Sequence, residues 1–376
     1  MKLFDYDVPD FLESGERARL MPTAKDSNKE QKVTSSLLAS IMAVNEFGRE
    51  LLTDVGAPAF KRSKISCYTE VVFKGNGDKK IRPDGLIIVE AGKKRWSALV
   101  EAKVGNNPLQ KDQIEAYLDL AKEHNIDALI TTSNQFASIQ THHPVNVAKV
   151  KTKKVSLYHW SWMLIMTKAI LLATNKNVSD PDQAFILEEL IRYLQHDNSG
   201  VLSFNKMDAS WKVVCSANHQ NIPLRKSAPE VASAVSNWHQ LTRFLALQMS
   251  VAVGEPVNAY LTRAQQSDAK KHLDDDIQTL VESGKLHSEF LIANAASRLQ
   301  LSADFKRRTL STSMRLDAPK DKQQVKSRVS WLIRQLSKCD SDETIIRLIW
   351  QGRAQDTSTT LRELKSGEFD YTLDYP

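Results

Sequence analysis

The sequence predicts an α/β fold in its N-terminal part, with the element order αβββαβ. Three observations support this fold class: an apolar stripe along a first helix, two β-rich runs joined by a turn rich in Gly and Lys, and a helix followed by a buried strand. In chain order, we expect a helix over 28–53, strands over 65–74, 81–89 and 96–104, a helix over 107–123 and a strand over 126–132.

The first helix carries apolar side chains at helical spacing, and this stripe should face the sheet. Its members are Val33, Leu37, Ile41, Val44 and Leu52. At about 100° per residue, Glu30 falls inside the stripe, whereas Glu46 and Glu50 fall nearly opposite it. A carboxylate at that place is costly unless it meets a partner. The sequence allows two alternative partners for the Glu30 carboxylate: a metal site beside the sheet, or a capping box with Ser27.

The hairpin formed by the second and third strands brings three charged residues together. If its turn centres on Gly92 and Lys93, antiparallel pairing sets Asp84 directly opposite Glu101. Opposed side chains lie roughly 5 Å apart at Cβ, so two carboxylates there repel each other unless a positive charge lies between them. A divalent metal ion is the natural candidate. Lys103, two residues beyond Glu101, should point to the same face.

The helix that follows the hairpin is predicted to begin at Asn107 and Pro108, with Asn as its cap and Pro at its first helical position. Gln113 and Tyr117 are four residues apart, so they should share one face of this helix.

These residues carry a family resemblance. Pro83-Asp84, followed by Glu101-Ala102-Lys103, resembles the signature of the PD-(D/E)XK phosphodiesterase superfamily, the restriction-endonuclease-like nucleases. Gln113 and Tyr117 match the Gln-x-x-x-Tyr motif of its RecB-type branch, and the element order is that of the superfamily core. The resemblance covers about residues 25–175 and implies a restriction-endonuclease-like fold with a mixed central sheet for them.

The resemblance also implies a role for each matching residue. It implies the catalytic residues Asp84, Glu101, Lys103, Gln113 and Tyr117, and the metal-binding residues Glu30, Asp84, Glu101 and Ala102. The carboxylates and the Ala102 carbonyl would offer oxygen ligands to Mg²⁺, with Mn²⁺ as a substitute. Lys103 would position the attacking water or hold it as hydroxide. The Gln and Tyr side chains would contact the substrate backbone or support Lys103.

The function expected from this resemblance is that of a Mg-dependent deoxyribonuclease that hydrolyses phosphodiester bonds. DNA is the expected substrate and RNA the alternative, and both phage defence and DNA repair suit such an enzyme. The competing hypothesis is a catalytically inactive nucleic-acid-binding or scaffold protein that keeps the fold. Inactive relatives usually lose one of the Asp, Glu or Lys residues, and this chain has all three.

Length and charge describe the rest of the chain. With 376 residues the chain exceeds the usual size of a single core, so we expect an N-terminal segment over 1–24, the nuclease domain over 25–175, a linker over 175–181 and a C-terminal α+β region of unassigned fold over 180–376. The net charge of +6 favours a polyanionic partner. We expect the C-terminal region to select the substrate, a protein partner or a second copy of the chain.

Two charged runs in the C-terminal region have alternative interpretations. The basic run over 306–334 suits either nucleic-acid phosphates or a solvated face. The acidic run Asp274-Asp275-Asp276 follows Lys270 and Lys271 by one helical turn, which favours paired charges on a solvated helix over a second metal site.

The remaining signals concern location. Cys67, Cys215 and Cys339 are far apart, which argues against a zinc site or a disulfide framework and fits a reducing cytoplasm. The first ten residues contain no apolar run, so no signal peptide is expected. The most hydrophobic stretch, Trp160–Ala173, is too short to span a bilayer and is expected to form a core helix. These signals predict a cytoplasmic protein without a membrane partner.

Overall fold

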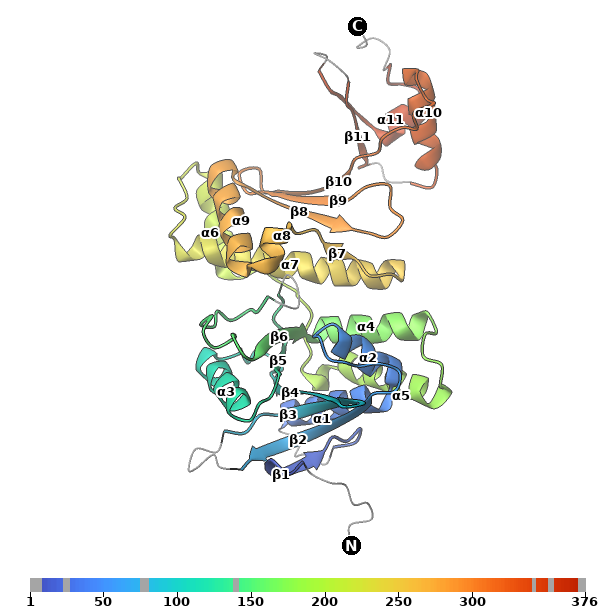
Figure 1. Cartoon of the computed structure of the whole chain (residues 1–376). Helices are drawn as coiled ribbons and strands as arrows, with labels where there is room; N and C mark the ends of the chain where they lie inside the picture. Colours follow the sequence, from blue (N-terminus) through green and yellow to red (C-terminus); the bar gives the residue numbers. More distant parts are fainter. Residues whose placement is uncertain are drawn as a thin grey trace. The chain divides into compact units, whose positions relative to one another are not determined.

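The structure is a computed structural model of the chain, and it describes residues 9–22, 28–74, 81–137, 142–339, 343–350 and 355–370. The chain divides into two compact units, Met1–Met314 and Arg315–Pro376 (Figure 1).

A six-stranded mixed sheet lies at the centre of the first part of unit 1 (Figure 1). Its strands, in spatial order, are β1 (Leu12–Arg17), β2 (Lys64–Phe73), β3 (Gly85–Ala91), β4 (Lys94–Ala102), β5 (Ala128–Ser133) and β6 (Ser156–Ser161). Neighbours from β1 to β4 are antiparallel, and β4, β5 and β6 are parallel. The predicted α/β class with a mixed sheet is confirmed at this level. Two strands are additional: β1 comes from the predicted N-terminal segment, and β6 takes up the start of the hydrophobic stretch at Trp160.

Helices cover both faces of this sheet. One face carries α1 (Lys29–Ala43), α2 (Asn45–Thr53), α4 (Trp162–Thr174) and α5 (Pro181–Gln195), and the other carries α3 (Lys111–Glu123). Each face has its own hydrophobic core: the first core lies under α1, α2, α4 and α5, and the second lies under α3. Side chains of β3 alternate between them, because Ile87 and Val89 belong to the first core and Leu86 and Ile88 to the second. All four side chains are at most 3% exposed, which is the pattern of a strand buried on both faces.

The predicted single helix over 28–53 is two helices. The chain leaves the helical conformation at Val44 (φ −104°, ψ 100°) and starts α2 one residue later. At this bend Gly48 lies so close to the end of α1 that an added Cβ would come within 2.1 Å of the Ile41 carbonyl oxygen. The apolar pattern runs through both helices because both pack on the same core, so periodicity did not reveal the break.

The start of α3 also differs from the prediction. The helix begins at Lys111 with Gln110 as its N-cap residue, so Asn107 and Pro108 lie before it. The Asn107 side chain donates a hydrogen bond to Glu30 (2.8 Å), and Leu109 is buried in the core under α3. The side chain of Asn107 therefore bonds to Glu30 instead of capping α3.

The predicted linker over 175–181 is a loop between two packed helices. Three buried leucines of α5, Leu187, Leu190 and Leu194, belong to the same core as α1 and α4. The first core therefore continues past residue 175, and packing does not break at the expected boundary.

The second part of unit 1 has its own core around Trp238, Phe290 and Phe305. Its elements are α6 (Ala209–His219), α7 (Pro229–Val253), β7 (Asn258–Ala259), α8 (Arg263–Ser267), α9 (Ala269–Ser283), β8 (Lys285–Leu291), β9 (Leu299–Asp304) and β10 (Thr309–Met314), preceded by a 3₁₀ turn at Asp197–Ser199. The strands form a four-stranded antiparallel sheet in the order β10-β9-β8-β7. The predicted pairing on α9 is seen between Lys271 and Asp275, whose charged atoms lie 2.6 Å apart.

Unit 2 is a small α+β unit. It contains α10 (Val325–Gln335), the antiparallel strands β11 (Ile345–Leu348) and β12 (Thr357–Thr360), and α11 (Leu361–Ser366). Its core is built on Val329, Ile346, Leu361 and Leu364.

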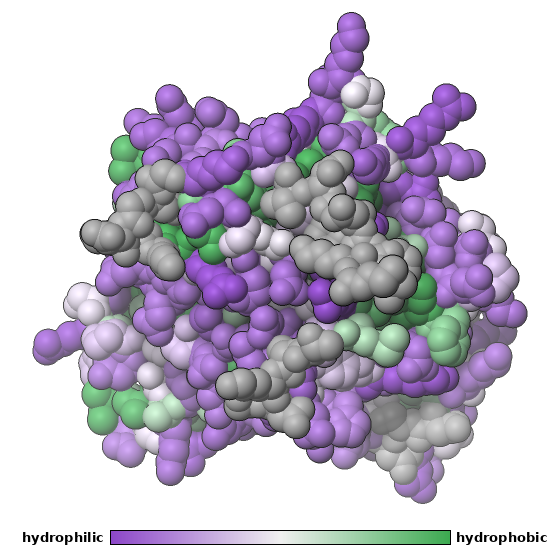
Figure 2. Space-filling model, turned by 90° about the horizontal axis from the view of Figure 1, so that it is seen from below, coloured by the Kyte–Doolittle hydropathy of each residue, from purple (hydrophilic) through white to green (hydrophobic). Residues whose placement is uncertain are grey.

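The face of the molecule drawn in Figure 2 is mainly hydrophilic, with hydrophobic residues in small separate groups. Among the described residues, no helix combines the length and the apolar character needed to cross a lipid bilayer. Apart from its first two residues, which belong to β6, the hydrophobic stretch forms α4, and Lys168 within it pairs with Glu50 (2.7 Å) and Asp54 (2.9 Å).

Candidate active site

The β3–β4 hairpin has the register that the sequence predicts. Ala91 pairs with Lys94 and Gly85 with Val100, so the next pair in this register is Asp84 and Glu101. Asp84 lies one residue before β3, and one of its carboxylate oxygens accepts a hydrogen bond from the backbone N–H of Ala102 (2.8 Å). This bond fixes the carboxylate against the end of β4.

The residue after Asp84 is a glycine for a packing reason. A Cβ on Gly85 would lie 2.5 Å from a methyl carbon of Leu38 in α1 and 3.2 Å from the Tyr68 carbonyl oxygen. The close approach of α1 and β2 to this point brings the start of β3 near the other elements of the site.

Glu101 and Lys103 form the central ion pair. Lys103 Nζ lies 2.6 Å from Glu101 Oε1, and the two side chains are 16% and 1% exposed. The second carboxylate oxygen of Glu101 is buried and has no hydrogen-bond partner among the described residues. A buried charged oxygen without a partner is costly, so this atom is suited to a further ligand.

Glu30 joins this pair from the first turn of α1. Its Oε2 lies 3.4 Å from Lys103 Nζ, and its Oε1 accepts from the Asn107 side chain at 2.8 Å. The α1 cap is Asn28, whose side chain accepts from the Gln31 N–H, while Ser27 lies outside the described residues. The Glu30 carboxylate thus faces the predicted site.

Gln113 and Tyr117 share one face of α3, as predicted. The Gln113 side-chain amide donates to the Tyr117 hydroxyl (3.1 Å), which donates to the Arg82 carbonyl oxygen (3.0 Å). Burial and the nearby charges of Glu101 and Asp84 raise the pKa of Tyr117, so its hydroxyl stays protonated at neutral pH. The pair therefore fixes the segment before Asp84.

Charge and burial act strongly on the site. Burial and the neighbouring Glu101 charge raise the pKa of Asp84 to about 8. Burial acts to lower the pKa of Lys103, but the carboxylates of Glu101, Asp84 and Glu30 outweigh it and raise this pKa. Three carboxylates grouped around one positive charge are typical of a place where a cation binds.

The donor set fits a hard divalent cation. Asp84 and Glu101 bring carboxylate oxygens to one place, and one Glu101 oxygen is without a partner. The oxygens of Glu30, Asp84 and Glu101 do not all converge within 4.8 Å; among the described residues, only His239, His272 and Asp276 form such a group. Lys103 instead bridges Glu30 and Glu101. The structure thus places Glu30 at the site as a partner of Lys103.

A cavity of about 430 Å³ lies beside Glu30. It is lined by residues 28–30 at the start of α1, by the 104–107 loop and by Gly200. Two backbones meet in its wall, where the Gly105 N–H donates to the Gly200 carbonyl (2.7 Å). A Cβ on Gly200 would lie 3.0 Å from Val104, so this contact needs a glycine. Of the residues of the candidate site, Glu30 and its partner Asn107 line this cavity.

Sequence reasoning missed two features of these sites. The sequence pattern predicts Asn107 as a helix cap, whereas in the structure it is a partner of Glu30, 77 residues away. His239 and His272 meet Asp276 in the second part of unit 1, although 33 residues separate the histidines and no short motif links them. Only the four-residue spacing of His272 and Asp276 on one helix could have signalled the second cluster.

Comparisons of the chain with protein-family models, with curated proteins and with solved structures found no match.

Proposed function

We propose that the chain is a metal-dependent nuclease that hydrolyses phosphodiester bonds, with DNA as its substrate. The observation that carries the proposal is the convergence of Asp84, Glu101 and Lys103 at the end of one β-hairpin, in a buried setting. The three residues stand in the spacing that resembles the PD-(D/E)XK signature. Purely structural roles, with Asp84 as a turn residue and Lys103 as a snorkelling side chain, do not explain why a Glu101 oxygen is buried without a partner.

The chain's own residues suit this chemistry. Asp84 and Glu101 would hold a Mg²⁺ ion, which when bound would neutralise charge on the phosphate and lower the pKa of a bound water. Lys103, kept in place by Glu101 and Glu30, can donate hydrogen bonds to the attacking water or to a phosphate oxygen. Asn107 restrains the Glu30 carboxylate from its other side.

The α3 residues would act as positioning residues. The Tyr117 hydroxyl holds the Arg82 carbonyl, two residues before Asp84, and Gln113 orients that hydroxyl. Arg82 also forms an ion pair with Glu70, which has a positive φ of 55° in strand β2. Both contacts keep the Pro83-Asp84 segment at the end of the hairpin, where a displacement of about 1 Å would reduce the rate strongly.

The test compares the wild-type protein with Asp84→Asn and Lys103→Gln variants on supercoiled, linear and single-stranded DNA and on RNA, with Mg²⁺, Mn²⁺ or EDTA. Glu46→Gln serves as a matched control, because Glu46 is a carboxylate of α2 that pairs with Arg49 and Ser179. We expect metal-dependent DNA cleavage by the wild type and the control, and a loss of at least roughly 10³-fold in both site variants.

Other outcomes would refute the proposal in different ways. Cleavage that survives in both site variants would place the activity elsewhere. Tight DNA binding without cleavage in any metal would favour the inactive binding protein. Cleavage of RNA alone would keep the nuclease and change the substrate class.

A further inference from the structure

Two histidines and one aspartate meet between α7 and α9, apart from the candidate active site. His239 Nε2 lies 2.7 Å from Asp276 Oδ2, and His272 Nε2 lies 3.4 Å from the same oxygen. His272 and Asp276 are four residues apart on α9, so they share a helix face, and α7 supplies His239.

The cluster is well shielded from solvent. The side chains of His239, His272 and Asp276 are 12%, 10% and 18% exposed, and they lie beside the core around Trp238. A carboxylate at such a place needs positive or hydrogen-bonding partners, and here both partners are imidazoles. Their ligating atoms and the carboxylate oxygen all lie within 4.8 Å of one another.

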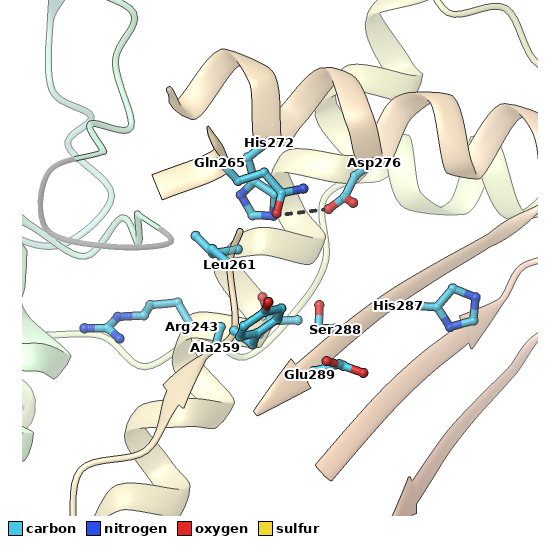
Figure 3. Close-up of a pocket in the computed structure, with 11 residues that line it drawn as sticks. Arg243, Ala259, Leu261, Gln265, His272, Asp276, His287, Ser288 and Glu289 are labelled. Carbon is cyan, nitrogen blue, oxygen red and sulfur yellow. Dashed lines mark ion pairs between the residues drawn. The ribbon is translucent and has the colours of Figure 1, made fainter. Parts of the chain in front are cut away.

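A cavity of about 250 Å³ adjoins the cluster (Figure 3). His272 and Asp276 form part of its wall, and Tyr260, Ser288 and Glu289 form another part. The cavity gives a bound ion room for a water or a small ligand in addition to the three side chains, as in zinc sites that keep an open position.

We propose that His239, His272 and Asp276 bind a divalent transition-metal ion of the Zn²⁺ class, with one coordination position open to the cavity. Two imidazoles and one carboxylate suit Zn²⁺, Fe²⁺ or Co²⁺, whereas Mg²⁺ prefers oxygen ligands only. The site therefore differs in metal preference from the all-oxygen site at Asp84 and Glu101.

Binding requires one local movement. The two imidazole rings stack with planes 9° apart and centroids 3.8 Å apart, so one ion cannot lie in both ring planes at once. His272 lines the cavity and His239 does not, so the movement that we infer is a turn of the His272 ring toward the cavity. Metal binding would bring each Nε2 to about 2.0–2.1 Å from the ion.

The test measures metal binding itself, in the full chain carrying Asp84→Ala so that the other candidate site does not contribute. Calorimetric titration with Zn²⁺ should show one ion bound per chain, and Co²⁺ should give the visible absorption of a four- or five-coordinate ion. Zn²⁺ should also raise the melting temperature by a few degrees when present far above Kd. Mg²⁺ should do none of these.

Variants decide which residues bind the ion. Asp276→Asn and His272→Ala should weaken Zn²⁺ binding by roughly 100-fold or more and abolish the Co²⁺ spectrum. His287→Ala is the matched control, because His287 lines the same cavity but is not one of the three residues. Asp276→Asn conserves size, and circular dichroism checks that each variant is folded. An absence of stoichiometric Zn²⁺ binding, or binding that these variants leave intact, would overturn the proposal.

Discussion

The ammonium of Lys103 lies 2.6 Å from the carboxylate of Glu101, and the two residues stand two apart on the same face of the chain as it leaves β4. Glu101 is 1% exposed, and Lys103 is the cation that its carboxylate contacts. The pair therefore serves both the stability of the fold and the proposed chemistry, and the two roles are separable by substitution.

The first prediction separates these roles. Lys103→Met should abolish cleavage and lower the free energy of unfolding by roughly 2–4 kcal/mol, because it leaves Glu101 buried without its charge partner. The double variant Glu101→Gln/Lys103→Met should recover much of that stability and none of the activity. Urea denaturation and a cleavage assay measure both quantities. Equal stability of the single and double variants would show that the ion pair does not couple the two residues.

The second prediction concerns Glu30. Glu30→Gln removes the charge that faces Lys103 but keeps a side chain that can bond to Asn107. We expect cleavage to fall by roughly 10- to 100-fold with little change in stability. Glu50→Gln is the control, since Glu50 pairs with Lys168 on α4. Full activity of the Glu30 variant would mean that the carboxylate only restrains the 104–107 loop.

Much of the candidate site follows from the sequence because it depends on local rules. The turn at Gly92 sets the register of Asp84 and Glu101, and the alternation of a strand places Lys103 beside them. The helical angle also distinguished Glu30 from the other acidic residues of the first helix. These rules act over a few residues and are visible without coordinates.

Other features depend on contacts between distant residues, which periodicity does not report. Asn107 faces Glu30 from 77 residues away, so its preference for helix caps was misleading. Strand β1 pairs with β2 through irregular register, with Glu70 at a positive φ of 55°, and no alternating pattern marks it. The α1–α2 break depends on the approach of Gly48 to Ile41.

The third prediction tests that approach. Gly48→Ala would put a Cβ within 2.1 Å of the Ile41 carbonyl oxygen, so the two helices must move apart. We expect a loss of roughly 2–4 kcal/mol in the free energy of unfolding. The matched control is Gly15→Ala, where the nearest atom lies at an ordinary 3.4 Å and the change should stay below about 1 kcal/mol. Similar stability of the two variants in urea denaturation would contradict this packing.

The fourth prediction rests on two histidines beside β5, of which His159 is buried and His143 is half-buried. The Thr131 hydroxyl lies 2.8 Å from His143 Nε2 and 2.9 Å from His159 Nδ1, and His159 Nε2 lies 2.9 Å from the Gln135 carbonyl oxygen. Burial lowers the pKa of His143 to about 4 and that of His159 to about 3. Both rings are therefore neutral in the folded protein at neutral pH.

The sign of the pH dependence follows from these shifts. In the unfolded chain a histidine takes up a proton near pH 6.5, so between pH 6.5 and about 4 the unfolded state binds more protons than the folded state. The free energy of unfolding should then fall as the pH falls through this window, by roughly 1.4 kcal/mol per pH unit for each histidine. His143→Gln should reduce the slope between pH 6 and 5 by about that amount. Urea denaturation at each pH, followed by tryptophan fluorescence, measures the slope. An unchanged slope in the variant would show that His143 takes up its proton in the folded protein as readily as in the unfolded chain.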